Sequence, residues 1–496
     1  SYTKTYYDIA GRQIREETVS FDGTVVYKDQ SYDANGLLSV VTYPYFSNQT
    51  GNIPVISYYY DNFLRPSQTI RSGAFTSQLE KWTYSGNTTT YETGDVNFNI
   101  EFSRTSTIDP TGKAIHVSEN NTTHLYYEYF SNRKPKKIIS NNHVVTFQYD
   151  NFGRQTQLND PDAGITTYAY DELDRLISQT DAQNHTYTMT YDPLGRMTTK
   201  TGQEGTVTYL YDNKPKGIGQ IGSVIGFNGI NCDYQYDNFG RLQSHTETIQ
   251  NKNYTFSYAY DNADRIIQQT FPSGYILQFH YNSNGYTEKI NHNTFNIWQC
   301  LNRNQFGQVT AYNMFNQYPH TFNYFDGRLQ GQYISLANAV STSITYTTSP
   351  TNDNILSAAY VNQYLLNGTY TGIMETYQYD NFYRLNNITT YNAVNRPVWI
   401  GWSSPVAQQN ISYAPNGNIL HKDGTGDYVY DPVKSHAVIK IENPAPDLIN
   451  KPQQNILYNS FLQPYQITEG NYELQYTYGY DQQRRISELK QNGNVV

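Results

Sequence analysis

The residues of this sequence that could do chemistry are carboxylates, histidines and an unusual number of tyrosines. Asp109-Pro110-Thr111-Gly112 and Asp192-Pro193-Leu194-Gly195 each place an aspartate before a turn. Aspartyl catalysis needs two carboxylates close enough to share a proton, and nothing in the spacing brings these two together. A tyrosine with a histidine or arginine could act as base and acid in a polysaccharide lyase, but 51 tyrosines make such pairs commonplace. We therefore predict no catalytic residue and no enzyme.

Ligands for a metal ion or a cofactor are sparse. Turn aspartates could supply oxygen ligands to calcium, but each turn typically offers one carboxylate, and the exception is Asp160-Pro161-Asp162, with two. The ten histidines show no H-E-x-x-H spacing, and Cys232 and Cys300 lack C-x-x-C spacing. No P-loop or G-x-S-x-G elbow occurs. We expect no metal and no cofactor, and we favour two buried thiols over one disulfide.

Composition restricts the class of protein. Aromatic residues make up 15% of the chain, which favours strands because rings pack well on a pleated surface. A formal charge of −9 with 16% charged residues gives no basic stripe, so we expect no nucleic-acid partner. No apolar run approaches the roughly 20 residues of a membrane span, and the start has no signal-peptide core. Because the chain begins without Met and within a repeat, we interpret it as a piece of a longer protein.

The tyrosines recur with aspartate at a regular period. The clearest copies, spaced by 21, 21, 20, 25 and 24 residues, are Tyr149-Asp150, Tyr170-Asp171, Tyr191-Asp192, Tyr211-Asp212, Tyr236-Asp237 and Tyr260-Asp261. Further copies are Tyr7-Asp8, Tyr32-Asp33, Tyr60-Asp61, Tyr379-Asp380, Tyr430-Asp431, Tyr480-Asp481 and a decayed Tyr281-Asn282. Self-similarity at this period predicts a repeat protein, with one array over residues 1–496.

Each copy extends to the pattern Y-D-x-x-G-R, which predicts a strand, a turn and a returning strand. The glycines and arginines that complete the clearest copies are Gly153, Arg154, Gly195, Arg196, Gly240 and Arg241, while Arg175 and Arg265 follow Asp174 and Asp264. Aspartate also tolerates positive φ, so the replacement keeps the same backbone requirement. We assign these residues structural roles in a repeated hairpin, and we expect the arginine to lie over a neighbouring tyrosine ring.

These hairpins predict an all-β fold of repetitive antiparallel YD-repeat units forming a spiralling sheet, either a cocoon-like shell or part of one. Helical spacing is nearly absent. Residues 286–373 are the least regular, and we expect them to continue the sheet with longer loops. A short helix is expected within 354–374.

Y-D-x-x-G-R at this period resembles the Rhs/YD-repeat family, and the bacterial members more than the animal teneurins. Asn416-Gly417-Asn418-Ile419 and Gly426-Asp427-Tyr428-Val429-Tyr430-Asp431-Pro432 resemble the late part of an Rhs array. The resemblance implies a shell like that of the B and C components of insecticidal toxin complexes, which surrounds a variable C-terminal toxin. The family's D-P-x-G-L-x-G protease signature is absent, so no autoproteolysis is assigned.

The function that we predict is a non-catalytic shell that encapsulates or scaffolds a polymorphic toxin. Its partners would be the toxin cargo or the rest of the same polypeptide. We expect the protein to be secreted, or to lie at the cell surface, after export by a specialised system. Two alternatives stay open. One is a surface adhesion or carbohydrate-binding module that uses tyrosine clusters such as Tyr58-Tyr59-Tyr60 and Tyr126-Tyr127, and the other is a lyase or hydrolase on the same scaffold.

Overall fold

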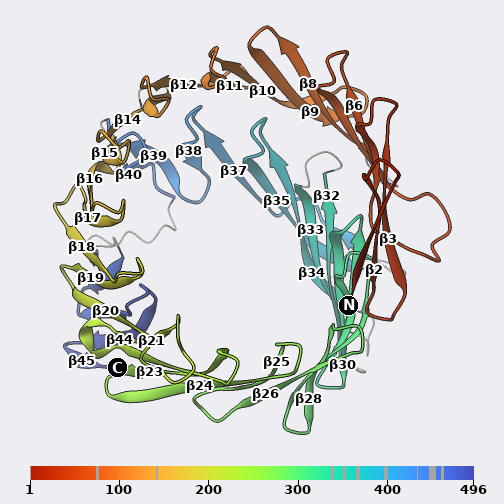
Figure 1. Cartoon of the computed structure of the whole chain (residues 1–496). Coiled ribbons are helices and arrows are strands. Elements are labelled where there is room, and N and C mark those ends of the chain that lie inside the picture. Colours follow the sequence, from red (N-terminus) through yellow and green to blue (C-terminus); the bar gives the residue numbers. More distant parts are fainter. Residues whose placement is uncertain are drawn as a thin grey trace. The chain divides into compact units, whose positions relative to one another are not determined.

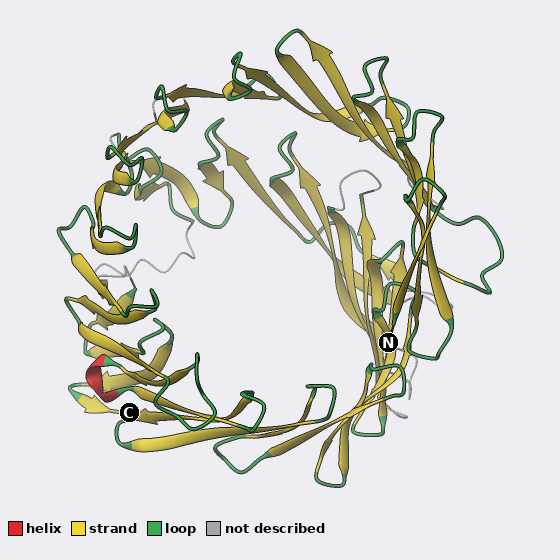
Figure 2. Cartoon of the chain, in the orientation of Figure 1, coloured by secondary structure: helices red, strands yellow, loops and turns green. Residues whose placement is uncertain are grey.

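The fold is all-β. The computed structural model describes residues 2–73, 77–140, 143–336, 340–349, 354–364, 369–395, 400–432, 434–445, 454–459 and 463–496. Within them the only helical element is a one-turn 3-10 helix, η1 (Phe227–Gly229), and the rest of the regular structure is antiparallel strand (Figure 2). The prediction of an all-β fold made of antiparallel hairpins is confirmed. None of the described residues belongs to a helix long and apolar enough to cross a membrane.

The chain forms two compact units. Unit 1 comprises Ser1–Tyr127, Phe279–Val429 and Val438–Ala445, and unit 2 comprises Glu128–Gln278, Tyr430–Ala437 and Pro446–Val496. Each unit is therefore assembled from segments that are far apart in the sequence. The single array over 1–496 stays a prediction.

Unit 2 contains a run of hairpins and a separate C-terminal sheet (Figure 1). The run includes β13 (Pro135–Ser140), β14 (His143–Tyr149), β15 (Gln155–Asp160), β16 (Gly164–Tyr170), β17 (Leu176–Thr180), β18 (Thr186–Tyr191), β19 (Met197–Gly202), β20 (Gly205–Tyr211), β21 (Ile221–Ile225), β22 (Asn231–Tyr236), β23 (Leu242–Ile249), β24 (Lys252–Tyr260) and β25 (Ile266–Thr270). The C-terminal sheet consists of β41 (Gln454–Tyr458), β42 (Pro464–Glu469), β43 (Tyr472–Tyr478), β44 (Arg484–Gln491) and β45 (Asn494–Val495).

Each hairpin of the run that is closed by a YD turn contains a bulge at the tyrosine of the pair, and the hairpins between them pair without one. β16 pairs antiparallel with β17, and the register shifts between Ala169 and Tyr170, so that Tyr170 lies opposite Leu176. The same shift precedes Tyr191 and Tyr236. A bulge increases strand twist locally, so this device twists the sheet once per repeat.

Unit 1 brings an early and a late run of strands together. The early run extends from β1 (Thr3–Tyr7) to β11 (Ala114–Glu119), and the late run from β27 (Thr287–His292) to β39 (Gly426–Tyr430). The hydroxyl of Tyr286 donates to the carbonyl of Val19 at 2.9 Å, and the side-chain amide of Asn120 donates to the carbonyl of Asn381 at 2.7 Å. These contacts join the early and the late run within unit 1.

The sheet has a thin core. Among the described residues only thirteen hydrophobic side chains are buried, and the most enclosed are Leu79, Val224 and Ile230. Along β16 exposed and half-buried residues alternate, so one face of the strand meets solvent. The densest packing is in unit 2, where Val207, Val224 and Cys232 form a buried cluster.

The C-terminal sheet packs on that cluster. Tyr480, which follows β43, contacts it, and its hydroxyl lies 3.1 Å from the hydroxyl of Tyr234 on β22. Arg485 of β44 forms two hydrogen bonds, 2.9 and 3.1 Å long, with the carboxylate of Glu247 on β23.

Two local predictions are corrected or sharpened by the structure. The helix expected within 354–374 is wrong, because β33 (Ile355–Tyr364) and β34 (Thr369–Tyr379) occupy that stretch and pair with one another. Alternating β-branched and aromatic residues favour strand there over the weak helical spacing. Longer loops were expected within 286–373, and residues 337–339, 350–353 and 365–368 of that stretch lie outside the described residues. Cys232 and Cys300 are buried free thiols, as predicted.

Candidate functional site: the tyrosine-aspartate turns

The aspartate of each repeat organises its turn. In the copy at Asp150, carboxylate oxygen Oδ1 accepts hydrogen bonds from the backbone N–H groups of Phe152 at 3.0 Å and Arg154 at 2.9 Å. Its other oxygen accepts from Nε of Arg154 at 2.7 Å. The same three bonds recur at Asp8, Asp61, Asp171, Asp192, Asp237, Asp261 and Asp380. One side chain thus satisfies two turn N–H groups and fixes the arginine.

The residue before the arginine takes the left-handed conformation. Gly153 has φ of 79° and Gly195 has φ of 82°, while Asp174 and Asp264, at the equivalent position, have φ of 62° and 60°. Aspartate is one of the few residues with a side chain that enters this region at low cost. This explains why the glycine of the repeat can be replaced by aspartate.

The arginine joins each turn to the next one. Nη1 of Arg154 donates to the carbonyl of Asp171 at 2.7 Å, and the guanidinium lies over the ring of Tyr170, 5.2 Å from its centroid. Arg175 makes the same two contacts with Asp192 and Tyr191. The cation–π contact that the sequence suggested is therefore between successive repeats.

The tyrosine hydroxyl makes a contact that the sequence did not indicate. The hydroxyl of Tyr191 donates to the carbonyl of Leu176 at 2.7 Å, and that of Tyr236 donates to the carbonyl of Ile221 at 2.6 Å. The acceptor follows the turn of the preceding hairpin, where the bulge leaves a carbonyl free to accept. Further examples are Tyr32, Tyr60, Tyr170, Tyr260, Tyr379, Tyr413 and Tyr478.

The hydrogen bonds of the turn keep its carboxylate ionised. At Asp261 the bond from the Arg265 side chain, and next the bond from its backbone N–H, lower the pKa of the carboxyl below its ordinary value. At Asp8 the backbone and side chain of Arg12 lower the pKa in the same way. These pairs are held as structural ion pairs, with no proton to exchange near neutral pH.

Four of the Tyr-Asp pairs depart from this geometry. At Tyr32-Asp33 the arginine position is Leu37, so only the two backbone N–H bonds to the carboxylate are made. At Tyr211-Asp212 the turn is longer, and the N–H of Asp212 donates to the carbonyl of Gln220. At Tyr430-Asp431 the N–H of Asp431 donates to the carbonyl of Ala437. The prediction that Tyr480 ends a strand and Asp481 begins the turn is wrong. The strand bulges at Tyr478 instead, and the tight turn begins at Gly479. Tyr480 is used for packing against unit 2's buried cluster instead.

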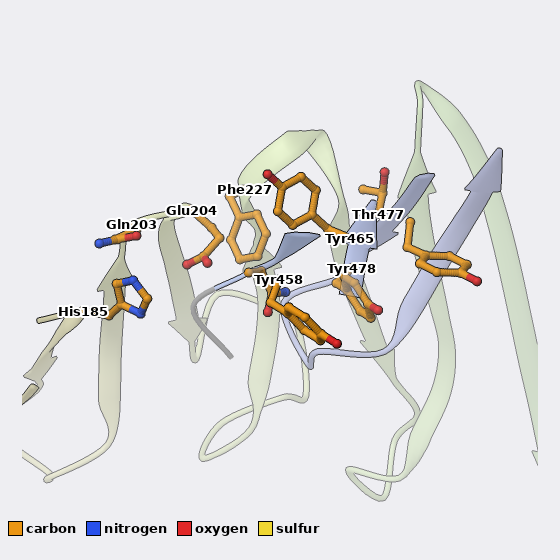
Figure 3. Close-up of a pocket in the computed structure, with 10 residues that line it drawn as sticks. His185, Gln203, Glu204, Phe227, Tyr458, Tyr465, Thr477 and Tyr478 are labelled. Carbon is orange, nitrogen blue, oxygen red and sulfur yellow. The ribbon is translucent and has the colours of Figure 1, made fainter. Parts of the chain in front are cut away.

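A cavity of about 410 Å³ in unit 2 lies between the hairpin turns and the C-terminal sheet (Figure 3). His185, Glu204 and Phe227 line it from the hairpin run, and Tyr458, Tyr465 and Tyr478 from the C-terminal sheet. His185 lies in a turn whose aspartate, Asp181, is 3.1 Å from its Nδ1. The cavity is thus an aromatic groove with its histidine already paired. Side chains able to hold a metal ion meet elsewhere, at His143, Asp162 and His436.

Solved structures with the same fold include toxin-complex proteins. The crystal structure of TcdB2-TccC3-Cdc42 matches with a TM-score of 0.78 at 16% identity, over 99% of this chain and 30% of that one. The crystal structure of TcdB2-TccC3 matches with a TM-score of 0.72 at 15% identity, over 99% and 30% of the two chains. The Photorhabdus luminescens Tc holotoxin pore with a mutated TccC3 gives 0.72 at 16%, over 98% and 29%. This chain therefore spans about 30% of the length of those chains.

A search of curated proteins found no match. The comparison with protein families found a match: the Teneurin YD-shell model covers residues 37–305, which is more than half of the chain's 496 residues. The resemblance to Rhs/YD-repeat proteins, carried by the Y-D-x-x-G-R turns, is confirmed. The chain belongs to the Teneurin YD-shell family and has the fold of the toxin-complex shells.

Proposed function

We propose that this chain is a non-catalytic part of a toxin-complex shell that encapsulates or scaffolds a C-terminal toxin. The observation that carries the proposal is the YD turn, in which the ionisable groups bind one another. Asp171 and Arg175 form an ion pair at 2.7 Å, and Arg175 also holds the next repeat. Groups engaged in this way build a wall and are not available as the acid or base of a reaction.

The exposed face of the hairpin run suits a wall that touches an unfolded guest. Threonine hydroxyls pair across neighbouring strands on exposed positions, at 2.8 Å between Thr180 and Thr186 and at 2.9 Å between Thr201 and Thr206. Such hydroxyls offer hydrogen bonds to a guest chain, and apolar side chains such as Ile165 and Leu210 are exposed beside them on the same run. The thin core supports the same proposal, since a globular enzyme of this length would bury much more side chain.

Protease protection tests the proposal. The complete protein that contains this chain is treated with protease, and the survival of its C-terminal toxin segment is followed by mass spectrometry. We expect protection that disappears when the toxin segment is expressed without residues 1–496. Equal rates of cleavage with and without the shell would contradict encapsulation. The proposal also implies export of the whole assembly, with its place outside the cell.

Carbohydrate binding is a second proposal, favoured by one feature of unit 1. Tyr59 is 48% exposed and, with Tyr58 and Tyr60, lines a cavity of about 620 Å³. Aromatic side chains at the edge of a cavity can stack on sugar rings. A glycan array probed with the wild-type chain and with Tyr59→Ala decides this: binding that the substitution abolishes supports adhesion, and silence of both proteins excludes it.

A further inference from the structure

Two histidines and an aspartate meet in unit 2, away from the YD turns. His143 begins β14, Asp162 lies in the turn between β15 and β16, and His436 lies in the turn that follows β39. The last of these is more than 270 residues from Asp162 in the sequence. Three separate segments therefore converge on one point.

The donor atoms already lie close to the spacing that a metal ion requires. Nδ1 of His143 is 3.4 Å from Oδ2 of Asp162, and Nε2 of His436 is 3.9 Å from the same oxygen. All three donor atoms lie within 4.8 Å of one another. Around a tetrahedral zinc ion, bonds of about 2.0–2.1 Å place ligand atoms about 3.3 Å apart, so small side-chain rotations complete the geometry.

Neighbouring groups hold the three ligands in place. Oδ1 of Asp162 accepts from the backbone N–H of His436 at 3.1 Å, which leaves Oδ2 directed at the imidazoles. Asp160 accepts the backbone N–H of Asp162 at 2.8 Å, and its other oxygen is 3.8 Å from Nε2 of His143. The usual outer partner of a metal-binding histidine is a carboxylate that accepts its second ring N–H; Asp160 lies on that side of the ring but is too far away for a hydrogen bond in this structure.

We propose that His143, Asp162 and His436 bind a divalent first-row transition ion, with zinc as the best fit. Two imidazoles and one carboxylate are typical zinc ligands, and water would complete the four-coordinate shell because His436 is exposed. Calcium, the ion suggested by Asp160-Pro161-Asp162 alone, takes six to eight oxygen ligands and does not suit two imidazoles. The ion would fasten the segment around His436 to the ends of β14 and β15.

The alternative is a cluster held together without a metal ion, by contacts such as the one of 3.1 Å between Nδ1 of His143 and Oγ of Ser435. Zinc would replace that contact with a bond to the same nitrogen. The proposal does not depend on the shell function.

Metal binding to the chelator-treated, untagged chain tests the proposal. Titration calorimetry with ZnCl₂ should show one ion per chain, and zinc should raise the unfolding temperature until a chelator is added. His143→Ala, Asp162→Asn and His436→Ala should each weaken zinc binding by more than about tenfold, since even outer-shell losses cost 10- to 100-fold. Cobalt in place of zinc should give the visible absorption of a four-coordinate site.

His185→Ala is the matched control, because His185 also pairs with an aspartate in a turn of unit 2 but has no second histidine in the cluster. It should bind zinc like the wild type. Circular dichroism in chelator verifies that each variant is folded, and anomalous scattering from zinc-soaked crystals of the wild type locates the ion directly. Absence of zinc binding by the wild type, or equal binding by the three ligand variants, overturns the proposal.

Discussion

At the scale of single residues, the aspartate of each repeat closes its own turn, and the arginine links that turn to the neighbouring hairpin. Asp171 binds backbone N–H groups of its own turn through one oxygen and Arg175 through the other. Arg175 continues to Asp192 and Tyr191 of the next repeat. Stability therefore passes along the chain by contacts between neighbours, as in other repeat proteins.

The tyrosine hydroxyl is testable as a link between repeats. Tyr236→Phe removes the 2.6 Å bond to the carbonyl of Ile221 while keeping the ring, and we expect a loss of about 1 kcal/mol in the free energy of unfolding. Urea denaturation measures it. Tyr254→Phe, at a tyrosine that is 39% exposed, should change the midpoint little. An equal effect of the two substitutions would contradict the role of the hydroxyl.

His245 should make the stability of unit 2 depend on pH. Its ring stacks on Phe256 at 4.8 Å between centroids, and burial lowers the pKa of His245 below 6.5. A histidine whose pKa is lowered in the folded state stabilises the fold above its unfolded pKa, and that stability is lost as the pH falls. We expect the urea midpoint of unfolding to decrease as the pH is lowered from about 7 to about 5. His245→Phe should make the midpoint depend less on pH. An unchanged pH profile in His245→Phe would refute the assignment.

At the scale of elements, each hairpin is specified by a tight turn and a bulge beside it. Asp192 N–H donates to the carbonyl of Arg196, and Gly195 N–H donates to the carbonyl of Asp192. The bulge at Tyr191 follows directly. Because turn and bulge come in every copy, successive hairpins twist in the same sense, and a long sheet of this kind curves.

Substitution of the turn glycine tests this element. Gly195 has φ of 82°, and a Cβ there would meet no heavy atom within 4 Å. Gly195→Ala should therefore cost only the conformational strain, about 1–2 kcal/mol in the free energy of unfolding. Gly195→Asn should cost less, because asparagine tolerates this region. Urea denaturation that ranks asparagine as worse than alanine would count against the turn interpretation.

At the scale of the whole molecule, both units join residues that are 238 to 292 positions apart. In unit 1 Tyr286 contacts Val19, 267 positions away, and in unit 2 Arg485 contacts Glu247, 238 positions away. In unit 1 a turn residue meets the end of a strand, and in unit 2 the side chains of two strands, β44 and β23, meet. Tertiary contacts of this kind add to the nearest-neighbour ladder and tie distant repeats into one unit.

The rate at which Cys232 reacts with a thiol reagent reports how closely the C-terminal sheet packs over it. Cys232 is 2% exposed, and burial raises the pKa of its thiol. Tyr480→Ala opens the cluster that covers it, so labelling of Cys232 by a thiol reagent should become about tenfold faster or more, as a one-unit fall in thiol pKa alone would produce. Cys300 of unit 1, which is 3% exposed, is the internal control. Equal acceleration at both thiols would indicate general unfolding and contradict a local role for Tyr480.

The sequence by itself determined the repeat, the strand type and the turn, because Asp150, Gly153 and Arg154 interact within five residues and need no distant partner. The tertiary structure alone decided which remote segments meet. It shifted the last turn so that Tyr480 lies inside it and packs on the cluster with Cys232, and it brought His436 to His143. The physical reason is that every repeat has similar local chemistry, so the sequence does not distinguish one distant neighbour from another. Their meeting depends on twist accumulated over hundreds of residues.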